Sequence, residues 1–367
     1  MISPLFKQLC ALGLVLTLLA AACGSAEVEP VDATGIKAAW IYAGEVGDLG
    51  WNATHDDARI VANDVTGATT FSVANIPEDG TDFEDLVRDL IVTDGVNVVF
   101  GTAFAHQNAM EQMAVDFPDV IFEHAGGFKR NGSNFGNFYG RVYEPRYVSG
   151  VAAALSSPSG KLGFVAGFPF PEVIRGINAF VLGAQSVNPD ASVEVVWTSS
   201  TSDAAVEANA ASALAEIGVD LIAVHQDTSA AGRVAQENGL RWIGFDSDRR
   251  QDAPGAFLTA VTFDWSQRYI DVIEAVARGE YEAGAYWGGL DDGVVGLADV
   301  SGLSDEDAET VAGELQRVAD GDVGVFDGPI RDQSGAERVA EGVRLTDDEL
   351  LTMDWFVQGV IGGIPSS

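Results

Sequence analysis

Hydrophobic and polar positions along the chain follow two alternating patterns. Short, continuous apolar runs, of which residues 38–42 are the first, have the length of strands buried on both faces. Between them lie longer stretches with apolar side chains at helical spacing, such as residues 83–91, which end at Gly95, a residue suited to a helix C-terminus. Strands that alternate with amphipathic helices predict an α/β fold with parallel sheets.

The order helix, glycine, strand occurs twice. Residues 83–91 and the strand-like run 96–100 show it first, and residues 206–217, Gly218 and residues 219–224 repeat it. A further helix and a further apolar run follow in both places. This pseudo-repeat predicts two lobes of similar construction, each a parallel sheet flanked by helices.

The boundary between the lobes is predicted after residue 148, close to a Ser-, Pro- and Gly-rich stretch at 156–160. We assign residues 36–148 to the first lobe and residues 149–264 to the first segment of the second lobe. Residues 265–367 are interpreted as crossover segments that complete both lobes.

The elements expected around and beyond this boundary have distinct patterns. A strand at 161–166 and a helix at about 171–187 open the second lobe, and a long helix is expected at 265–278. Residues 293–300 are strand-like, and an amphipathic last helix is predicted near 347–360. We interpret that last helix as core packing.

The N-terminus has the pattern of a secretion signal over residues 1–22. Lys7 precedes an apolar run at 9–19, which is too short for a permanent membrane span and is followed by three alanines and Cys23. This arrangement resembles a lipobox, so Cys23 is the predicted lipidation site and residues 23–35 a tether. An ordinary signal peptide followed by an incidental cysteine is the alternative.

Cysteine content and charge narrow the class of protein. Only Cys10 and Cys23 are present and Cys10 lies in the predicted signal, so the mature domain has neither a disulfide nor a thiolate site and must rest on a hydrophobic core. Without residues 1–22, 19 Lys and Arg residues face 55 Asp and Glu residues, a net charge of −36. This balance excludes nucleic acid as a partner and disfavours adhesion to anionic headgroups. An acidic surface with few lysines suits a salt-rich habitat, because dissolved salt screens the repulsion between its carboxylates.

Ligands of open parallel sheets bind beyond the carboxyl ends of the strands, so we examined the residues that follow each predicted strand. These segments are polar or aromatic in both lobes, namely 44–52, 101–106 and 123–125 in the first and 167–169, 198–203, 225–228 and 245–248 in the second. Aromatic rings can stack on a flat ligand, and carboxylates or amides can bind its polar edge or its sugar hydroxyls. The candidate ligand-binding side chains are Trp51, Asp48, Asn52, Phe104, Phe168, Gln226, Asp246, Asp248 and Trp287. Trp51 is the strongest stacking candidate.

Several of these residues have a structural alternative. Asp48 and Asn52 flank a helix start and also suit capping, and Phe104 and Trp287 also suit a hydrophobic core. Asp246 and Asp248 also suit a turn, although two carboxylates there add to an acidic crevice. The histidines show no metal-ligand spacing, so no metal site is expected among His55, His106, His124 and His225.

Motifs of the common catalytic and cofactor sites do not occur in the sequence. The glycine-rich stretch at 44–50 lacks the spacing of a dinucleotide-binding loop, and neither a phosphate loop nor a nucleophile elbow is found. We therefore expect no cofactor and no enzyme activity.

Long motifs of unusual composition give the chain a family resemblance. From Lys37 to Pro365 it resembles the basic membrane protein family of lipoprotein solute receptors, the group that includes purine nucleoside receptor A. The resemblance rests on residues 43–52, FPDVIFEHAGGFK (117–129), YGRVYEPRYVSG (139–150), GFPFPEVIRGINAFVLGA (167–184), GFDSD (244–248) and MDWFVQGVIGGIP (353–365). It implies the two-lobed type I fold of periplasmic binding proteins, with a three-segment hinge and a purine base or nucleoside bound between the lobes.

The resemblance also assigns roles to individual residues. Trp51 matches the first-lobe aromatic that stacks on the purine, and Asp48 and Asn52 match polar neighbours in the same loop. Asp246 matches the carboxylate that holds ribose hydroxyls in nucleoside binders.

Two departures bear on the ligand. Thr201 and Ser202 stand where relatives place a second stacking aromatic, and Asp291 stands where many nucleoside binders have lysine. The carboxylate of Asp291 would favour a donor-rich edge, such as the amino group of adenine, over a carbonyl.

Together these features predict a monomeric solute-binding lipoprotein of an ABC importer, anchored on the extracytoplasmic face of the cell membrane. It would deliver a purine base or nucleoside to a membrane permease. The alternative is a lipid-anchored sensor that passes a signal to a membrane receptor.

Overall fold

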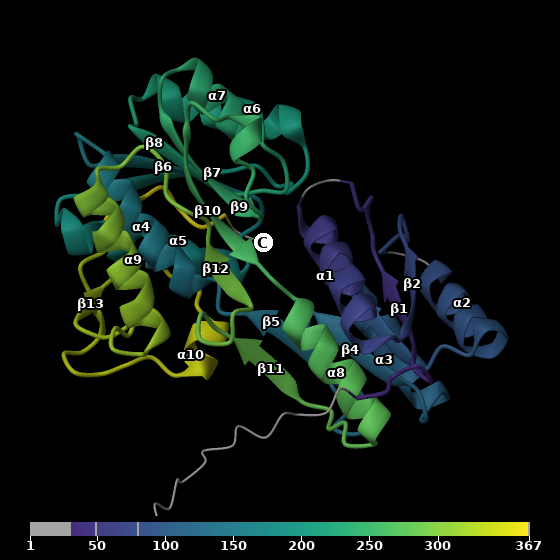
Figure 1. Cartoon of the computed structure of the whole chain (residues 1–367). Coiled ribbons are helices and arrows are strands. Elements are labelled where there is room, and N and C mark those ends of the chain that lie inside the picture. Colours follow the sequence, from purple (N-terminus) through teal and green to yellow (C-terminus); the bar gives the residue numbers. More distant parts are fainter. Residues whose placement is uncertain (1–30, 48–49, 79–80, 366–367) are drawn as a thin grey trace, which may run out of the picture. The chain divides into compact units, whose positions relative to one another are not determined.

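The computed structural model describes residues 31–47, 50–78 and 81–365. Over these residues the chain forms two lobes, each built on a sheet of mainly parallel strands with helices on its faces (Figure 1). The predicted α/β class and two-lobed organisation are confirmed.

The first lobe contains a six-stranded sheet in the order β11-β5-β4-β3-β1-β2, in which every neighbouring pair is parallel. Its strands are β1 (Lys37–Ile41), β2 (Thr69–Val73), β3 (Val98–Gly101), β4 (Ile121–Ala125), β5 (Phe135–Gly140) and β11 (Ala285–Gly288). Its helices are α1 (Trp51–Thr66), α2 (Asp82–Asp89), the π-helical turn η1 (Leu90–Asp94), the short 3₁₀ turn η2 (Phe104–His106), α3 (Gln107–Asp116) and α8 (Ser266–Arg278). As predicted, the helical run before β3 ends at Gly95, which adopts φ 75°.

The second lobe contains a seven-stranded sheet in the order β12-β10-β9-β8-β6-β7-β15, parallel except where β12 meets β10. Its strands are β6 (Lys161–Ala166), β7 (Ser192–Trp197), β8 (Leu221–His225), β9 (Arg241–Asp246), β10 (Phe257–Phe263), β12 (Val295–Leu297) and β15 (Val360–Ile361). Its helices are α4 (Tyr143–Ser156), α5 (Pro171–Val187), α6 (Ala204–Glu216), α7 (Ala230–Glu237), the 3₁₀ turn η3 (Arg250–Asp252), α9 (Asp305–Ala319) and α10 (Asp347–Leu351). A small antiparallel ribbon of β13 (Ile330–Arg331) and β14 (Glu337–Val339) accompanies them.

Helix α4 lies in the second lobe because it packs closely on α5. A Cβ atom added at Gly150 would collide with the carbonyl oxygen of Phe180, and one at Gly183 with that of Tyr147. Only glycine lets the two backbones approach in this way. The chain therefore leaves the first sheet after Gly140, a few residues before the boundary expected at residue 148.

The chain passes between the lobes at three places, after β5, after β10 and after β11. The returning segment is fixed to the first lobe through the buried carboxylate of Glu123 on β4. One oxygen of Glu123 accepts hydrogen bonds from the Arg268 guanidinium of α8, at 3.0 Å, and from the Tyr281 hydroxyl, at 2.7 Å. Figure 1 shows α8, in green, in the same lobe as the purple and blue elements that begin the chain.

The predicted last helix at 347–360 is wrong beyond Leu351. The backbone of the following residues forms hydrogen bonds with other segments: the amide of Val357 donates to Asn178, and the amide of Gln358 donates to the carbonyl of Arg331. These partners replace the bonds that a helix would make within itself. The apolar side chains of the segment are nevertheless buried in the second-lobe core, as expected: Met353, Phe356, Val357 and Val360.

Candidate functional site

The strand order reverses next to β1 in the first sheet and next to β6 in the second. Strand β1 lies between β3 and β2, and β6 lies between β8 and β7. Ligands of open α/β sheets bind at the carboxyl ends of the strands at such points. The loops that follow β1, β3, β6 and β8 are therefore the expected walls of a crevice, as the sequence predicted.

Trp51, the first residue of α1, joins two of these loops. Its indole Nε1 donates a hydrogen bond to the carbonyl oxygen of Thr102, after β3, at 2.8 Å. Its ring meets those of Phe263 and Trp265 edge-on, with centroids 5.6 and 5.7 Å apart. The half-buried indole is thus held by one hydrogen bond and by the segment that crosses between the lobes.

Behind Trp51 lies a buried histidine. His55, one helical turn further on, meets the Trp51 ring edge-on at 4.4 Å and stacks on Trp265 at 4.9 Å. Its Nδ1 lies 2.6 Å from the Tyr269 hydroxyl. Burial lowers the pKa of His55 far below its usual range, so the imidazole is neutral and acts as part of an aromatic support.

In the second lobe, Gln226 follows β8 and is 1% exposed. Its amide nitrogen donates to the Thr198 hydroxyl, after β7, at 2.9 Å, while its Oε1 accepts no hydrogen bond from the described residues. The amide of Asp227 donates to the carbonyl of Thr201 at 2.7 Å. These bonds tie together the loops after β7 and β8 and leave a buried acceptor at their junction.

Asp246, the last residue of β9, is fully buried and adopts φ 68°, an uncommon conformation for a residue other than glycine. The guanidinium of Arg146, on α4, is also fully buried and interacts electrostatically with it. Arg146 donates to the carbonyl of Val224 at 2.7 Å, and its charge lies 4.5 Å from the Phe245 ring centroid. Burial lowers the pKa of Arg146 to about 9, and Asp246 opposes that shift.

Arg146 was not among the candidates drawn from the sequence. It is a lone cation in an otherwise mostly apolar helical run, and that isolation was the available signal. A buried charge of this kind is retained only where a partner stabilises it, which here is the carboxylate of Asp246.

Two of the predicted aromatic residues lie on the surface at the ends of strands. Phe104, after β3, is 51% exposed, and Phe168, after β6, is 36% exposed. Phe170, which the sequence analysis did not single out, has its ring centroid 6.0 Å from that of Phe104 and 5.6 Å from that of Phe168. The rings of Phe104, Phe168 and Phe170 therefore form one aromatic cluster.

Trp287 and Asp291 lie at the hinge. The Trp287 ring has the guanidinium groups of Arg141 and Arg175 at 4.2 and 4.9 Å from its centroid, and its Nε1 donates to the carbonyl of Gly140 at 3.0 Å. Asp291 is exposed in the turn after β11, close to Glu144. Burial, with Asp291 and Asp292 nearby, raises the pKa of Glu144 to about 6.

The remaining candidates differ in their setting. Asp248 is exposed and forms an ion pair with Arg250 at 2.6 Å, and the Arg250 guanidinium lowers its pKa. Asn52 lies in the first turn of α1, half-buried, with its side-chain amide close to Gly44. Asp48 and Cys23 lie outside the described residues.

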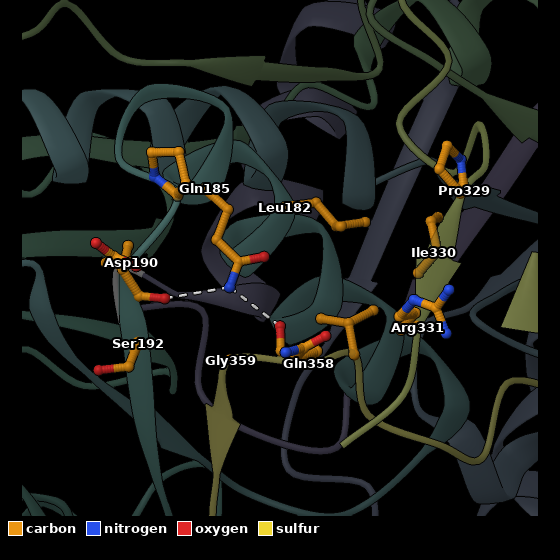
Figure 2. Close-up of a pocket in the computed structure, with 12 residues that line it drawn as sticks. Leu182, Gln185, Asp190, Ser192, Pro329, Ile330, Arg331, Gln358 and Gly359 are labelled. Atoms are coloured by element: carbon orange, nitrogen blue, oxygen red, sulfur yellow. Dashed lines mark hydrogen bonds between the residues drawn. The ribbon is translucent and has the colours of Figure 1, made fainter. Parts of the chain in front are cut away.

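A cavity of about 520 Å³ lies away from the crevice loops. It is bordered by α5, by the residues that lead into β7 and by the segments around β13 and residue 358 (Figure 2). Figure 2 shows Gln185 in its wall, and the Gln185 amide donates to the carbonyls of Ala191 and Gln358. This cavity is at the amino end of β7. The side-chain amide of Gln185 joins the residues that lead into β7 to the segment around residue 358.

The described residues contain neither a metal-binding cluster nor a membrane-spanning helix. No group of three or more His, Cys, Asp or Glu side chains in the described ranges is arranged to hold a metal ion. No helix in this part of the chain has both the length and the apolar character needed to cross a membrane.

Comparison with protein families gives a match over most of the chain. Residues 36–321 match the family described as ABC transporter substrate-binding protein, PnrA-like. The chain belongs to this family. It is therefore an ABC transporter substrate-binding protein of the PnrA-like (basic membrane protein) family, a family of extracytoplasmic solute receptors.

Individual relatives of this PnrA-like protein cover nearly its whole length. It is 40% identical over 334 residues to a purine-binding protein of Brucella abortus, covering 90% of this chain and 94% of the relative. It is 36% identical over 351 residues to a putative ABC transporter glucose-binding protein of Haloferax volcanii, covering 93% and 85%. An ABC transporter solute-binding protein from Aeropyrum pernix shares the fold, with a TM-score of 0.68 at 17% identity, covering 86% of this chain and 97% of that one.

Proposed function

We propose that this PnrA-like protein binds a purine base or nucleoside between its lobes and delivers it to a membrane permease. The observation that supports it best is the placement of Trp51 and Asp246. One is a half-exposed indole held by Thr102, and the other is a buried carboxylate at the end of β9. A flat aromatic ligand suits the first group, and ribose hydroxyls suit the second.

The ligand class also draws on the relatives. The 40% identical protein from Brucella abortus is named for purine binding, and the 36% identical protein from Haloferax volcanii is named for glucose binding. Both ligands carry donors that a carboxylate can bind, amino or ring N–H groups in a purine and hydroxyls in a sugar, and both can stack on an indole. The two buried polar residues, Gln226 and Asp246, provide acceptors for either ligand, but a purine makes fuller use of the Trp51 ring.

Calorimetry with adenine, adenosine, guanosine, inosine and glucose tests the ligand class. Saturable, tight binding of at least one purine, with glucose binding weakly or not at all, is expected. Tight binding of glucose alone would show that the transported ligand is a sugar and not a purine. Binding of none of the five ligands would contradict the proposal.

We also propose that Cys23 carries a lipid that keeps the protein beside its permease. Labelling of cells with a fatty-acid analogue should mark the wild-type protein but not a C23S variant, which should appear in the soluble extracytoplasmic fraction. Equal labelling of both forms would exclude Cys23 as the attachment site. Sedimentation of the purified mature protein should give a monomer.

A further inference from the structure

Four phenylalanine rings form an exposed row on the side of the crevice loops. Phe104 and Phe128 follow β3 and β4 in the first lobe, and Phe168 and Phe170 follow β6 in the second. Their exposed fractions are 51% and 68%, then 36% and 49%. In a chain with 55 acidic residues and 20 basic residues, a cluster of exposed aromatic rings needs a specific explanation.

The row crosses from one lobe to the other at the Phe104–Phe170 pair. The centroids of Phe128 and Phe104 are 6.2 Å apart, and those of Phe168 and Phe170 are 5.6 Å apart, both within one lobe. Between the lobes, Phe104 and Phe170 lie 6.0 Å apart with their planes inclined by 22°. This is an offset-stacked geometry, which contributes stability beyond the burial of area.

The backbone on both sides of this contact is fixed. Phe170 stands between Pro169 and Pro171, in an extended conformation, and its carbonyl accepts from two amides in the first turn of α5, those of Val173 and Ile174, at 3.0 Å each. Proline restricts the chain, so the ring is held in place at little entropic cost.

On the opposite lobe, Phe104 begins the short 3₁₀ turn η2. The next amide, that of Ala105, donates to the Glu78 carboxylate at 3.0 Å, and the amide of His106 donates to the carbonyl of Ala103 at 3.1 Å. The loop that carries Phe104 is therefore held on both sides of the ring.

A second close approach joins the same lobes nearby. A Cβ atom added at Gly50, which precedes Trp51, would lie 3.1 Å from the carbonyl oxygen of Asp227, after β8. The two lobes thus approach each other both at Trp51 and at the phenylalanine pair.

From this geometry we propose that Phe104 and Phe170 are positioning residues that hold the lobes together and so set ligand affinity without touching the ligand. A ligand that binds between two lobes binds the closed arrangement, and its apparent affinity depends on how readily that arrangement forms. The Phe104–Phe170 pair stabilises the closed arrangement whether or not a ligand is present. The test below uses purines as probes and in that respect rests on the proposed function.

The test compares F104A, F170A and the double variant with F128A as the matched control. Phe128 belongs to the same row and is the most exposed of the four, and its ring pairs with that of Phe104 in its own lobe. Affinities for adenine and adenosine are measured by calorimetry and dissociation rates by stopped flow. F104A and F170A should each weaken binding about 2- to 10-fold, by the same factor for both ligands and mainly through faster dissociation. F128A should bind like the wild type.

The double variant separates a shared contact from two independent ones. If the rings act as one pair, it should bind no more weakly than the weaker single variant. Multiplied effects, or a factor that differs between adenine and adenosine, would show that the rings contact the ligand and would overturn the proposal. Unchanged affinity in both single variants would also overturn it.

A ligand-free measurement keeps this proposal separate from the purine assignment. A wild-type protein that binds no purine contradicts the proposed function alone. Solution scattering of the ligand-free proteins then tests the ring pair: F104A and F170A should have a larger radius of gyration than the wild type, and F128A should not. Equal radii in all four proteins would contradict the role of the pair.

Discussion

The indole nitrogen of Trp51 donates a 2.8 Å hydrogen bond to the carbonyl oxygen of Thr102, so the loops after β1 and β3 are joined by the side chain proposed to stack on the ligand. Replacing it by alanine should weaken purine binding by roughly 1 to 3 kcal/mol, the contribution of base stacking on an aromatic side chain. Calorimetry with adenine measures the loss.

W51F is the matched variant, because it keeps an aromatic face while it loses the hydrogen bond to Thr102 and part of the ring area. It should weaken binding less than W51A does. If W51A bound as tightly as the wild type, the stacking residue would lie elsewhere.

The role of Asp246 is tested by comparing a nucleoside with its base. If its carboxylate accepts ribose hydroxyls, D246N should weaken adenosine binding roughly tenfold or more and leave adenine nearly unaffected, because hydrogen bonds to charged groups are worth about 1.5 to 3 kcal/mol. D248N is the control, since Asp248 belongs to the same loop but is exposed and paired with Arg250. An equal loss for adenine and adenosine would mean that Asp246 acts on the base or on the fold.

Trp287 should contribute to stability. The guanidinium groups of Arg141 and Arg175 pack on its ring, and both make further bonds to the region of α10: Arg141 to Asp347, and Arg175 to the carbonyl of Leu350. Because the ring is half-buried, W287A should lower the free energy of unfolding by about 2 kcal/mol, less than a fully buried tryptophan would. Denaturant titration measures this loss. A stable W287A protein with greatly weakened purine binding would instead place Trp287 in the ligand site.

Glu207 predicts a pH dependence of stability. It is fully buried on α6, where it accepts hydrogen bonds from the Thr228 hydroxyl and from the Ala231 amide, and burial raises its pKa to about 7. Since the folded state holds this proton more tightly than the unfolded chain does, the carboxyl destabilises the fold as pH rises from about 4.5 towards 7. Relative to E207Q, the wild type should lose up to about 3 kcal/mol over that interval.

Urea titrations of both proteins at several pH values measure this difference directly. The histidines act in both proteins alike: burial lowers the pKa of His55, His106, His124 and His225, so each destabilises the fold on acidification below about pH 6.5. Their contribution cancels in the comparison. Parallel stability curves would show that Glu207 is ionised at neutral pH.

Where local chemistry sets an element, the sequence predicted it closely. Helix α5 begins at Pro171, the favoured first helical residue, and ends at Val187 as expected. Strand β5 was missed because its sequence, FGNFYG, contains glycines and an asparagine in place of a continuous apolar run, although it lies between two parallel neighbours. Its strand character comes from those neighbours.

In the candidate site too, the residues placed by local sequence were predicted, and those placed by distant contacts were not. Proximity to a strand end brought Trp51, Gln226 and Asp246 to the predicted crevice loops. Trp287 lies within β11 and Asp291 in the turn after it, but β11 reaches the first sheet only through the returning segment, and the contacts of both residues lie at the hinge. Arg146 escaped notice because its importance comes from Asp246, which is 100 residues away in the sequence. Such long-range pairs are not visible in local patterns.

The second sheet ends on both sides in very short strands: β12 has three residues, and β15 has two. An unpaired strand edge is a template on which another chain can add, and short edge strands reduce that risk. Strand β15 pairs with Val193 and Glu194 of the six-residue β7, and Gly362, with φ 108°, follows it directly. The residues around Val360 thus cover part of the β7 edge, which reduces the chance that a strand of another molecule adds to this sheet.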